Sequence, residues 1–128
     1  MDAETEELAR FLDGAVAAGD FPHREHVRMA FALLRRHEFT DAVLRYANAL
    51  RGITQRAGKP EGFNLTVTIA FLALIAERMA AGTAQDFAAF ARANPDLFVK
   101  GILARWYRPE QLASPLARRV FLMPDPAA

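Results

Sequence analysis

The stretch from Asn64 to about Ala81 restricts the possible folds more than any other part of the chain. It is apolar on almost every side and carries no charged residue before Glu77, so the helix that it predicts has no wide face suited to water. Such a helix is stable in water only when other helices surround it. We therefore expect residues 64–81 to form the buried central helix of an all-α bundle.

Apolar residues recur with helical spacing in most of the remaining chain. Gly19 is expected to stop the first helix, Asp20 to cap the second, Thr40 to cap the third and Thr83 to cap the fifth. The other predicted helices are about 3–18, 21–37, 41–57 and 84–93, followed by short helical segments between residues 97 and 123. No strand pattern or internal repeat interrupts them. A chain of 128 residues that is 52% apolar therefore predicts one compact domain, residues 1–128, with about five main helices.

Charge and composition narrow the classes of function. The formal net charge is only +1, whereas a dedicated nucleic-acid binder usually carries a strong basic excess. The chain has no cysteine, so thiolate metal sites and cysteine nucleophiles are excluded. The acidic start is unlike a signal peptide, and the most apolar run, of about a dozen residues, is too short to span a bilayer. We expect a cytoplasmic protein with neither a nucleic-acid nor a membrane partner.

Two histidines, His23 and His26, stand three residues apart at the start of the second predicted helix. On a helical wheel both fall on the apolar side, opposite the arginines of the same helix. The positive end of the helix dipole disfavours a charged imidazolium, so both rings are expected to be neutral at pH 7. Neutral imidazole is the form that binds a metal ion or acts as a general base.

The sequence leaves two interpretations of this pair open. Side chains three apart on a helix can converge on one ion or one substrate, which would make His23 and His26 catalytic residues, metal ligands or both. Alternatively, each ring hydrogen-bonds to a loop carbonyl or a carboxylate. His37 lies about 16 Å further along the helix axis and is expected to be a surface residue outside the site.

The start of the fourth predicted helix supplies further polar groups. Asn64 and Thr68 share one stripe with Phe71, and they would bind substrate if the starts of the two helices lie together. Phe63 and Trp106 are the predicted aromatic contacts of that substrate. The alternative is that Asn64 caps the helix and Thr68 bonds back to the preceding turn.

Three motifs together resemble an uncharacterised family of small, all-helical bacterial proteins. Its members carry F-x-H-x-x-H-[LV]-R, then Y-H-x-T-[LI]-T at the start of a later helix, and finally an Arg-aromatic-Tyr followed by S-P-x-A-R and an aromatic segment before P-D. The corresponding segments here are FPHREHVR, FNLTVT and RWYRPEQLASPLARRVFLMPD. The resemblance implies a metal site built across two helix starts.

The chain departs from that pattern at the positions that matter most for a metal. Asn64 stands where the family usually has a third histidine, Phe63 replaces the tyrosine, and Trp106 replaces a histidine found in many members. Two imidazoles and an amide oxygen bind zinc, iron or copper less firmly than three imidazoles do. This member is therefore expected either to bind a divalent transition metal weakly or to work without one.

Three classes of function follow from these residues. The first is a small-molecule enzyme of lyase, isomerase or cyclase type centred on His23 and His26, with or without a metal. The second is a non-catalytic helical module that binds a small ligand or a partner in a degenerate metal site. The third, a nucleic-acid regulator, lacks an exposed recognition helix. No glycine-rich phosphate loop occurs, so no nucleotide cofactor is expected, and a homodimer is compatible with each class.

Overall fold

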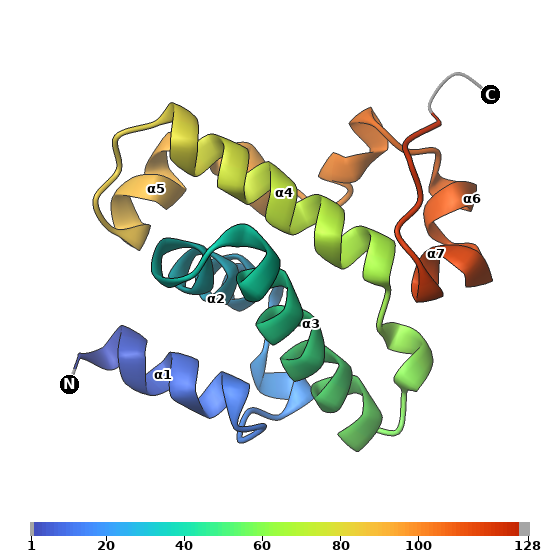
Figure 1. Cartoon of the computed structure of the whole chain (residues 1–128), viewed down its shortest axis with the longest axis horizontal. Helices are drawn as coiled ribbons and strands as arrows, with labels where there is room; N and C mark the ends of the chain where they lie inside the picture. Colours follow the sequence, from blue (N-terminus) through green and yellow to red (C-terminus); the bar gives the residue numbers. More distant parts are fainter. Residues whose placement is uncertain (1, 126–128) are drawn as a thin grey trace.

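The structure, a computed structural model, describes residues 2–125 and confirms the all-α class (Figure 1). None of these residues forms a strand. Short 3-10 turns join several of the helices, and the turn Pro95–Phe98 matters most for the site described below. The α-helices are α1 (Ala3–Leu12), α2 (His23–Arg36), α3 (Phe39–Arg56), α4 (Leu65–Ala81), α5 (Phe87–Ala93), α6 (Pro109–Leu112) and α7 (Pro115–Arg119).

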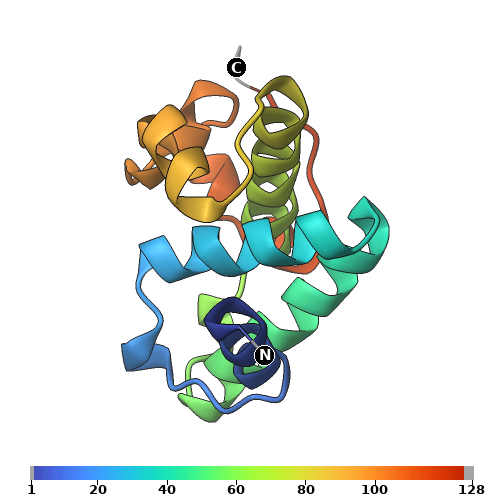
Figure 2. The same cartoon turned by 90° about the vertical axis from the view of Figure 1, so that its left-hand side faces the viewer.

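Helix α2 is the element around which the other helices gather. It packs against α1, α3, α4 and α5, and also against the turn Pro95–Phe98. Figure 2 shows α2 crossing the molecule between α1 on one side and α4 on the other. Its buried residues include Val27, Ala30 and Leu33, which repeat at the spacing of one helix face. Because these elements cover α2 on several sides, it occupies the central place that the sequence analysis predicted for residues 64–81.

Helix α4 begins at its predicted cap, Asn64, but it is less enclosed than predicted. It packs against α2, α3 and α7, and one flank stays open beside Ala70 and Ala73. The segment Pro60–Ala81 is long and apolar enough to cross a membrane by length and composition, and 33% of its most apolar window is buried here. The core helix of a water-soluble protein passes the same test.

The first helix is shorter than predicted because of Gly14. Helix α1 ends at Leu12, and Gly14 adopts a left-handed conformation with φ of +79°. The amides of Gly14 and Ala15 then donate to the carbonyls of Phe11 and Arg10, at 3.3 and 2.8 Å. This pair of bonds is the glycine-based ending that satisfies the last carbonyls of a helix, so the chain turns five residues before Gly19.

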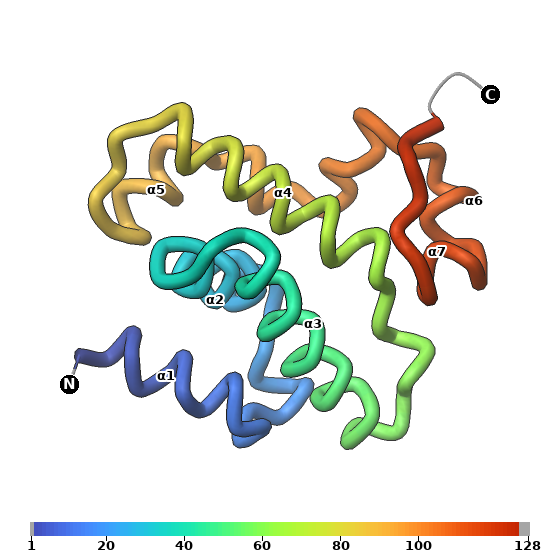
Figure 3. Tube along the Cα trace, in the orientation of Figure 1, coloured from blue at the N-terminus to red at the C-terminus, as the bar shows by residue number. Residues whose placement is uncertain are grey.

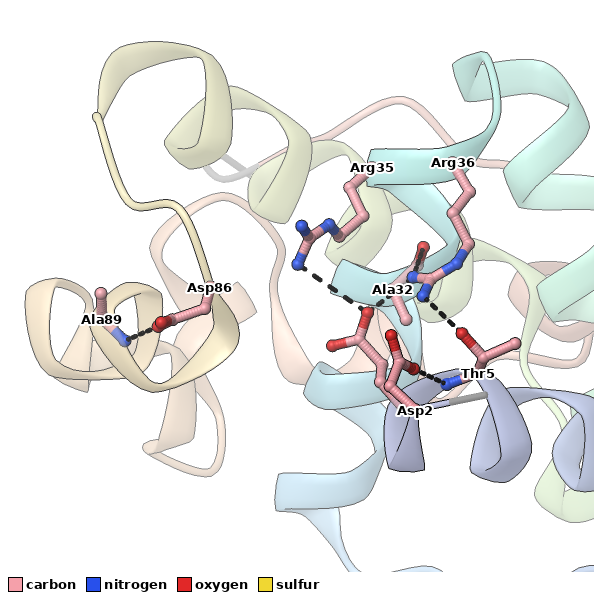
Figure 4. Close-up of polar contacts among 8 residues, drawn as sticks. Asp2, Thr5, Ala32, Arg35, Arg36, Asp86 and Ala89 are labelled. Carbon is pink, nitrogen blue, oxygen red and sulfur yellow. Dashed lines mark hydrogen bonds and ion pairs between the residues drawn. The ribbon is translucent and has the colours of Figure 1, made fainter.

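Three predicted helix caps also proved wrong. Helix α3 begins at Phe39 with Glu38 at its N-cap, so Thr40 lies inside the first turn. Helix α2 has Pro22 at its N-cap, with no side-chain cap, so Asp20 does not serve there. Helix α5 is capped by Asp86, whose carboxylate accepts from the Ala89 amide at 2.8 Å, instead of by Thr83 (Figure 4). Capping residues are common in loops, and only the chain path decides which of them meets a free amide.

Charged side chains hold the start of α1 against the end of α2. Arg36 donates to the Glu4 carboxylate at 2.6 Å and to the Thr5 hydroxyl at 3.3 Å. Figure 4 shows Arg35 and Arg36 extending from α2 towards the start of α1. The acidic start of the chain is thus partly neutralised by the basic end of the central helix.

The residues 120–125, here called the C-terminal strap, run as an extended segment beside the first half of α4 (Figure 3). The buried hydroxyl of Thr66 donates to the Val120 carbonyl at 2.6 Å and accepts from the Leu122 amide at 3.1 Å. The Tyr107 hydroxyl donates to the Leu122 carbonyl at 2.9 Å. Side chains therefore supply the hydrogen bonds that a neighbouring strand would supply in a sheet.

Candidate functional site

A cavity of about 170 Å³ lies where α2, α3 and α4 meet. Its apolar wall comprises Ala30, Leu50, Val67, Phe71 and Leu72. Its polar residues are His23, His26, Tyr46, Asn64 and Thr68. Four of the predicted site residues therefore come together here, because the starts of α2 and α4 lie side by side as the prediction required.

His23 is the first residue of α2 and lies at the solvent-exposed mouth of this cavity. Its Nε2 atom is 2.9 Å from the main-chain oxygen of Leu97. A carbonyl oxygen can only accept, so Nε2 carries the proton, and Nδ1 of the neutral ring keeps a lone pair. The imidazole and the Phe71 ring pack edge to face, with ring centroids 5.3 Å apart. The ring is therefore fixed in both tautomer and position.

An ion pair ties the turn Pro95–Phe98, which carries the Leu97 carbonyl, to α4. Arg78 of α4 donates to both carboxylate oxygens of Asp96, each at 2.8 Å. This bidentate contact lowers the pKa of Asp96 to about 2, so the pair stays charged at neutral pH. Leu97 follows Asp96 in the turn, and its fully buried side chain anchors the turn as well. An ion pair on α4 thus positions the acceptor of a histidine on α2.

His26 lies deeper than His23 and is partly buried. Its ring packs on Phe21 with centroids 4.4 Å apart, and Phe21 in turn stacks on Phe11 at 5.0 Å. Burial, reinforced by the neighbouring His23, lowers the pKa of His26 to about 4, although hydrogen bonding to the Phe21 backbone partly opposes this shift. His26 is therefore a neutral imidazole at pH 7.

The two imidazole rings are close enough to act on one small molecule. Their centroids are 6.3 Å apart, and both rings border the same cavity. In its neutral form each ring has one nitrogen that donates and one that accepts. The pair therefore brings two hydrogen-bond acceptors to one end of an otherwise apolar cavity.

Asn64 and Thr68 line the cavity, but most of their hydrogen bonds serve the backbone. The Asn64 side chain accepts from the Val67 amide at 3.0 Å and donates to the Leu112 carbonyl at 2.7 Å. The Thr68 hydroxyl donates to the Asn64 carbonyl at 2.7 Å. Both residues thus make the helix-start contacts that the sequence offered as the alternative. The only hydroxyl proton of Thr68 is used in this way, whereas Asn64 keeps one amide proton beyond its bond to Leu112.

The two predicted aromatic contacts lie elsewhere. Phe63 is buried beside the cavity, and its ring is covered by the Arg51 guanidinium at 4.5 Å. Trp106 borders a separate surface pocket of about 210 Å³ together with Leu74 and Phe121. The resemblance aligned Trp106 with a histidine position, but the chain path carries it to the open flank of α4. His37 lies at the far end of α2, beside Asp41, as predicted.

Sequence reasoning missed two parts of the site, Tyr46 and the Leu97 carbonyl. Tyr46 is buried in α3, and its hydroxyl donates to the His26 carbonyl at 3.3 Å. Burial raises the pKa of Tyr46, so this hydroxyl stays neutral. Its helical spacing with the buried residues Ala42 and Ile53 is a signal for a core position and not for a site, and a main-chain carbonyl leaves no signature in a sequence.

The side chains around the cavity give a metal ion only two firm ligands. Within residues 2–125 no group of three or more His, Asp or Glu side chains is placed to hold a metal. The Asn64 oxygen already accepts from an amide. Catalytic zinc sites generally use three protein ligands, so the residues present fit a metal poorly.

Comparisons with known proteins add no relative. The chain matches no protein-family model, no curated protein and no solved structure.

Proposed function

We propose that the chain is a small-molecule enzyme of lyase, isomerase or cyclase type, in which His23 transfers a proton to and from a molecule held in the cavity. The hydrogen bond from Nε2 of His23 to Leu97 carries this proposal. It leaves Nδ1 as the basic atom of a ring whose orientation is fixed, which is what a general base requires. The exposed position of His23 lets the proton pass on to solvent.

His26 has a different role in this proposal. A general base works best when its pKa lies near the working pH, and a pKa of about 4 makes His26 a weak base at pH 7. A neutral imidazole still donates or accepts hydrogen bonds without bringing charge into an apolar site. We assign His26 to orienting the substrate, and His23 to moving the proton.

A metal-assisted form of the same site is the alternative arrangement. A histidine that donates its other ring nitrogen to a carbonyl is the usual partner arrangement behind a metal ligand, and His23 has it. Against it stands the ligand set of two imidazoles described above. We therefore propose the metal-free form, and elemental analysis of the purified protein before and after chelation tests the choice.

A non-catalytic binding module is favoured by one observation. Asn64 and Thr68 direct their hydrogen bonds to the backbone, so they hold the shape of the site rather than a reacting group. In such a module both histidines could be replaced with little effect on ligand binding. The catalytic form instead requires His23.

Isotope exchange with the solvent tests proton transfer without knowledge of the full reaction. Cyclohexanone is neutral and of one-ring size, and its carbonyl oxygen can accept from the second amide proton of Asn64. The loss of its α-hydrogens to deuterated water is followed by NMR. The wild type is expected to exceed the buffer rate, His23→Gln to fall to it, and His37→Gln to match the wild type. Equal rates for wild type and His23→Gln would refute the catalytic proposal. Activity that disappears with chelation would support the metal-assisted form.

A further inference from the structure

The walls of the histidine cavity carry no fixed charge. No lysine, arginine, aspartate or glutamate from the described part of the chain lines it. The Arg51 guanidinium, on the helix that supplies Tyr46 and Leu50 to the cavity, lies over the Phe63 ring. A carboxylate or phosphate placed inside would lose its water and find no cation, which costs several kcal/mol by the general cost of burying unpaired charge. The cavity therefore selects against charged molecules.

Its volume limits the size of what it holds. An apolar cavity of about 150 Å³ accepts benzene, and the present one measures about 170 Å³. One six-membered ring with a single small substituent fills it. The apolar faces of such a ring would pack against Leu50, Val67 and Phe71, which line the cavity.

The donor and acceptor atoms at the site that still lack a partner determine which polar group a ligand needs. Nε2 of His23 is committed to Leu97, which leaves an acceptor on that ring. The hydroxyl protons of Thr68 and Tyr46 are already donated to main-chain carbonyls, so their oxygens too can only accept. The site thus offers several acceptors in an apolar setting, against one remaining donor among the described residues, the second amide proton of Asn64. A ligand satisfies the acceptors with an O–H or N–H group.

We propose that the cavity binds an uncharged, single-ring molecule that presents an O–H or N–H group to His23 and His26. Phenols, azoles and the enol forms of cyclic ketones belong to this class. The inference rests on the proposed function, because it names the ligand class of the same site. The inference also excludes charged metabolites, such as phosphate esters, as substrates of this site.

Three single-ring probes test the ligand class on the wild-type chain. Phenol is neutral at pH 7 and donates an O–H, anisole lacks the donor, and benzoate is charged. Binding is followed by amide and histidine ring shifts in protein NMR. Phenol is expected to shift His26, Val67 and Thr68, and anisole to bind roughly fivefold or more weakly because one hydrogen bond is lost. Benzoate is expected to leave these signals unchanged.

A pair of variants locates the binding. Val67→Phe fills the cavity and should abolish the phenol shifts, whereas Val99→Phe makes the same change at an exposed position and should preserve them. The selectivity among the three probes is measured on the wild type, so it tests the ligand class even if Val67→Phe fails to fold. Benzoate binding as strongly as phenol, or no phenol shifts at all, would overturn the inference.

The two proposals fail in different ways. Selective phenol binding without exchange of cyclohexanone hydrogens would refute catalysis and leave the ligand class standing. Exchange that depends on His23, without selective binding of phenol, would refute the ligand class and leave proton transfer standing.

Discussion

Nε2 of His23 and the main-chain oxygen of Leu97 are 2.9 Å apart, although 74 residues separate them in the chain. The bond connects the first residue of α2 to the turn after α5, and Arg78 of α4 secures that turn through Asp96. Three elements that are distant in sequence thus determine the tautomer of one imidazole. The ion pair acts on the site through the backbone, without entering the cavity.

Replacing Asp96 should therefore change the tautomer populations of the His23 ring. Asp96→Asn removes the bidentate ion pair and loosens the Leu97 carbonyl, so the neutral His23 ring should shift from one dominant tautomer to a mixture. The ¹⁵N shifts of its ring nitrogens measure this. Arg105→Gln is the matched control, because Arg105 makes a single contact of 3.3 Å to the same carboxylate. Unchanged ring shifts in Asp96→Asn would show that the buried Leu97 side chain alone holds the turn.

His26 should make stability fall with acid in a defined window. Its pKa is about 4 in the folded chain and 6.5 in the unfolded one, so the unfolded chain takes up the proton first as the pH falls. Above pH 6.5 this group contributes no pH dependence. Between pH 6.5 and 4 the free energy of unfolding should drop by about 2 kcal/mol, after allowance for the partial exposure of the ring. Urea unfolding of wild type and His26→Gln at several pH values isolates this loss, which the variant should lack.

Thr66 and Thr68 provide a matched pair on one helix. Thr66→Val keeps the side-chain shape but removes both hydrogen bonds to the C-terminal strap, and should cost about 2 kcal/mol of unfolding free energy. Thr68→Val removes only a bond to the preceding turn and should cost less than about 1 kcal/mol. Hydrogen exchange at Leu122 should accelerate in the first variant only. Similar costs for both would mean that the strap contributes little to stability.

Gly14 and Gly19 should respond differently to alanine. At Gly14 the backbone is left-handed, and an added Cβ would lie 2.9 Å from Nη1 of Arg56, so Gly14→Ala should destabilise by about 1–2 kcal/mol. At Gly19 nothing lies within 4 Å of the added atom, so Gly19→Ala should change stability by less than about 0.5 kcal/mol. Thermal unfolding of both variants checks the difference.

The convergence of His23 and His26 was predictable because their three-residue spacing places them on one face of any helix. The cap at Asn64 was predictable for a similar reason, since its partner is the Val67 amide three residues away. The early end of α1 was also within reach, because Asp13-Gly14 is a strong turn signal. In each case the decisive contact lies within one or two turns of the chain.

The sequence by itself therefore determined the helical class, most helix boundaries and the pairing of the two histidines. Tertiary structure alone decided that α2 is the central helix, that Leu97 holds His23, and that Tyr46 joins the wall while Trp106 lies on another face. Helix periodicity is a local property that depends on neighbours a few residues apart. Which helix is enclosed, and which carbonyl meets which ring, depends instead on how apolar faces share the core. Residues tens of positions apart settle that together, through the surface that they bury.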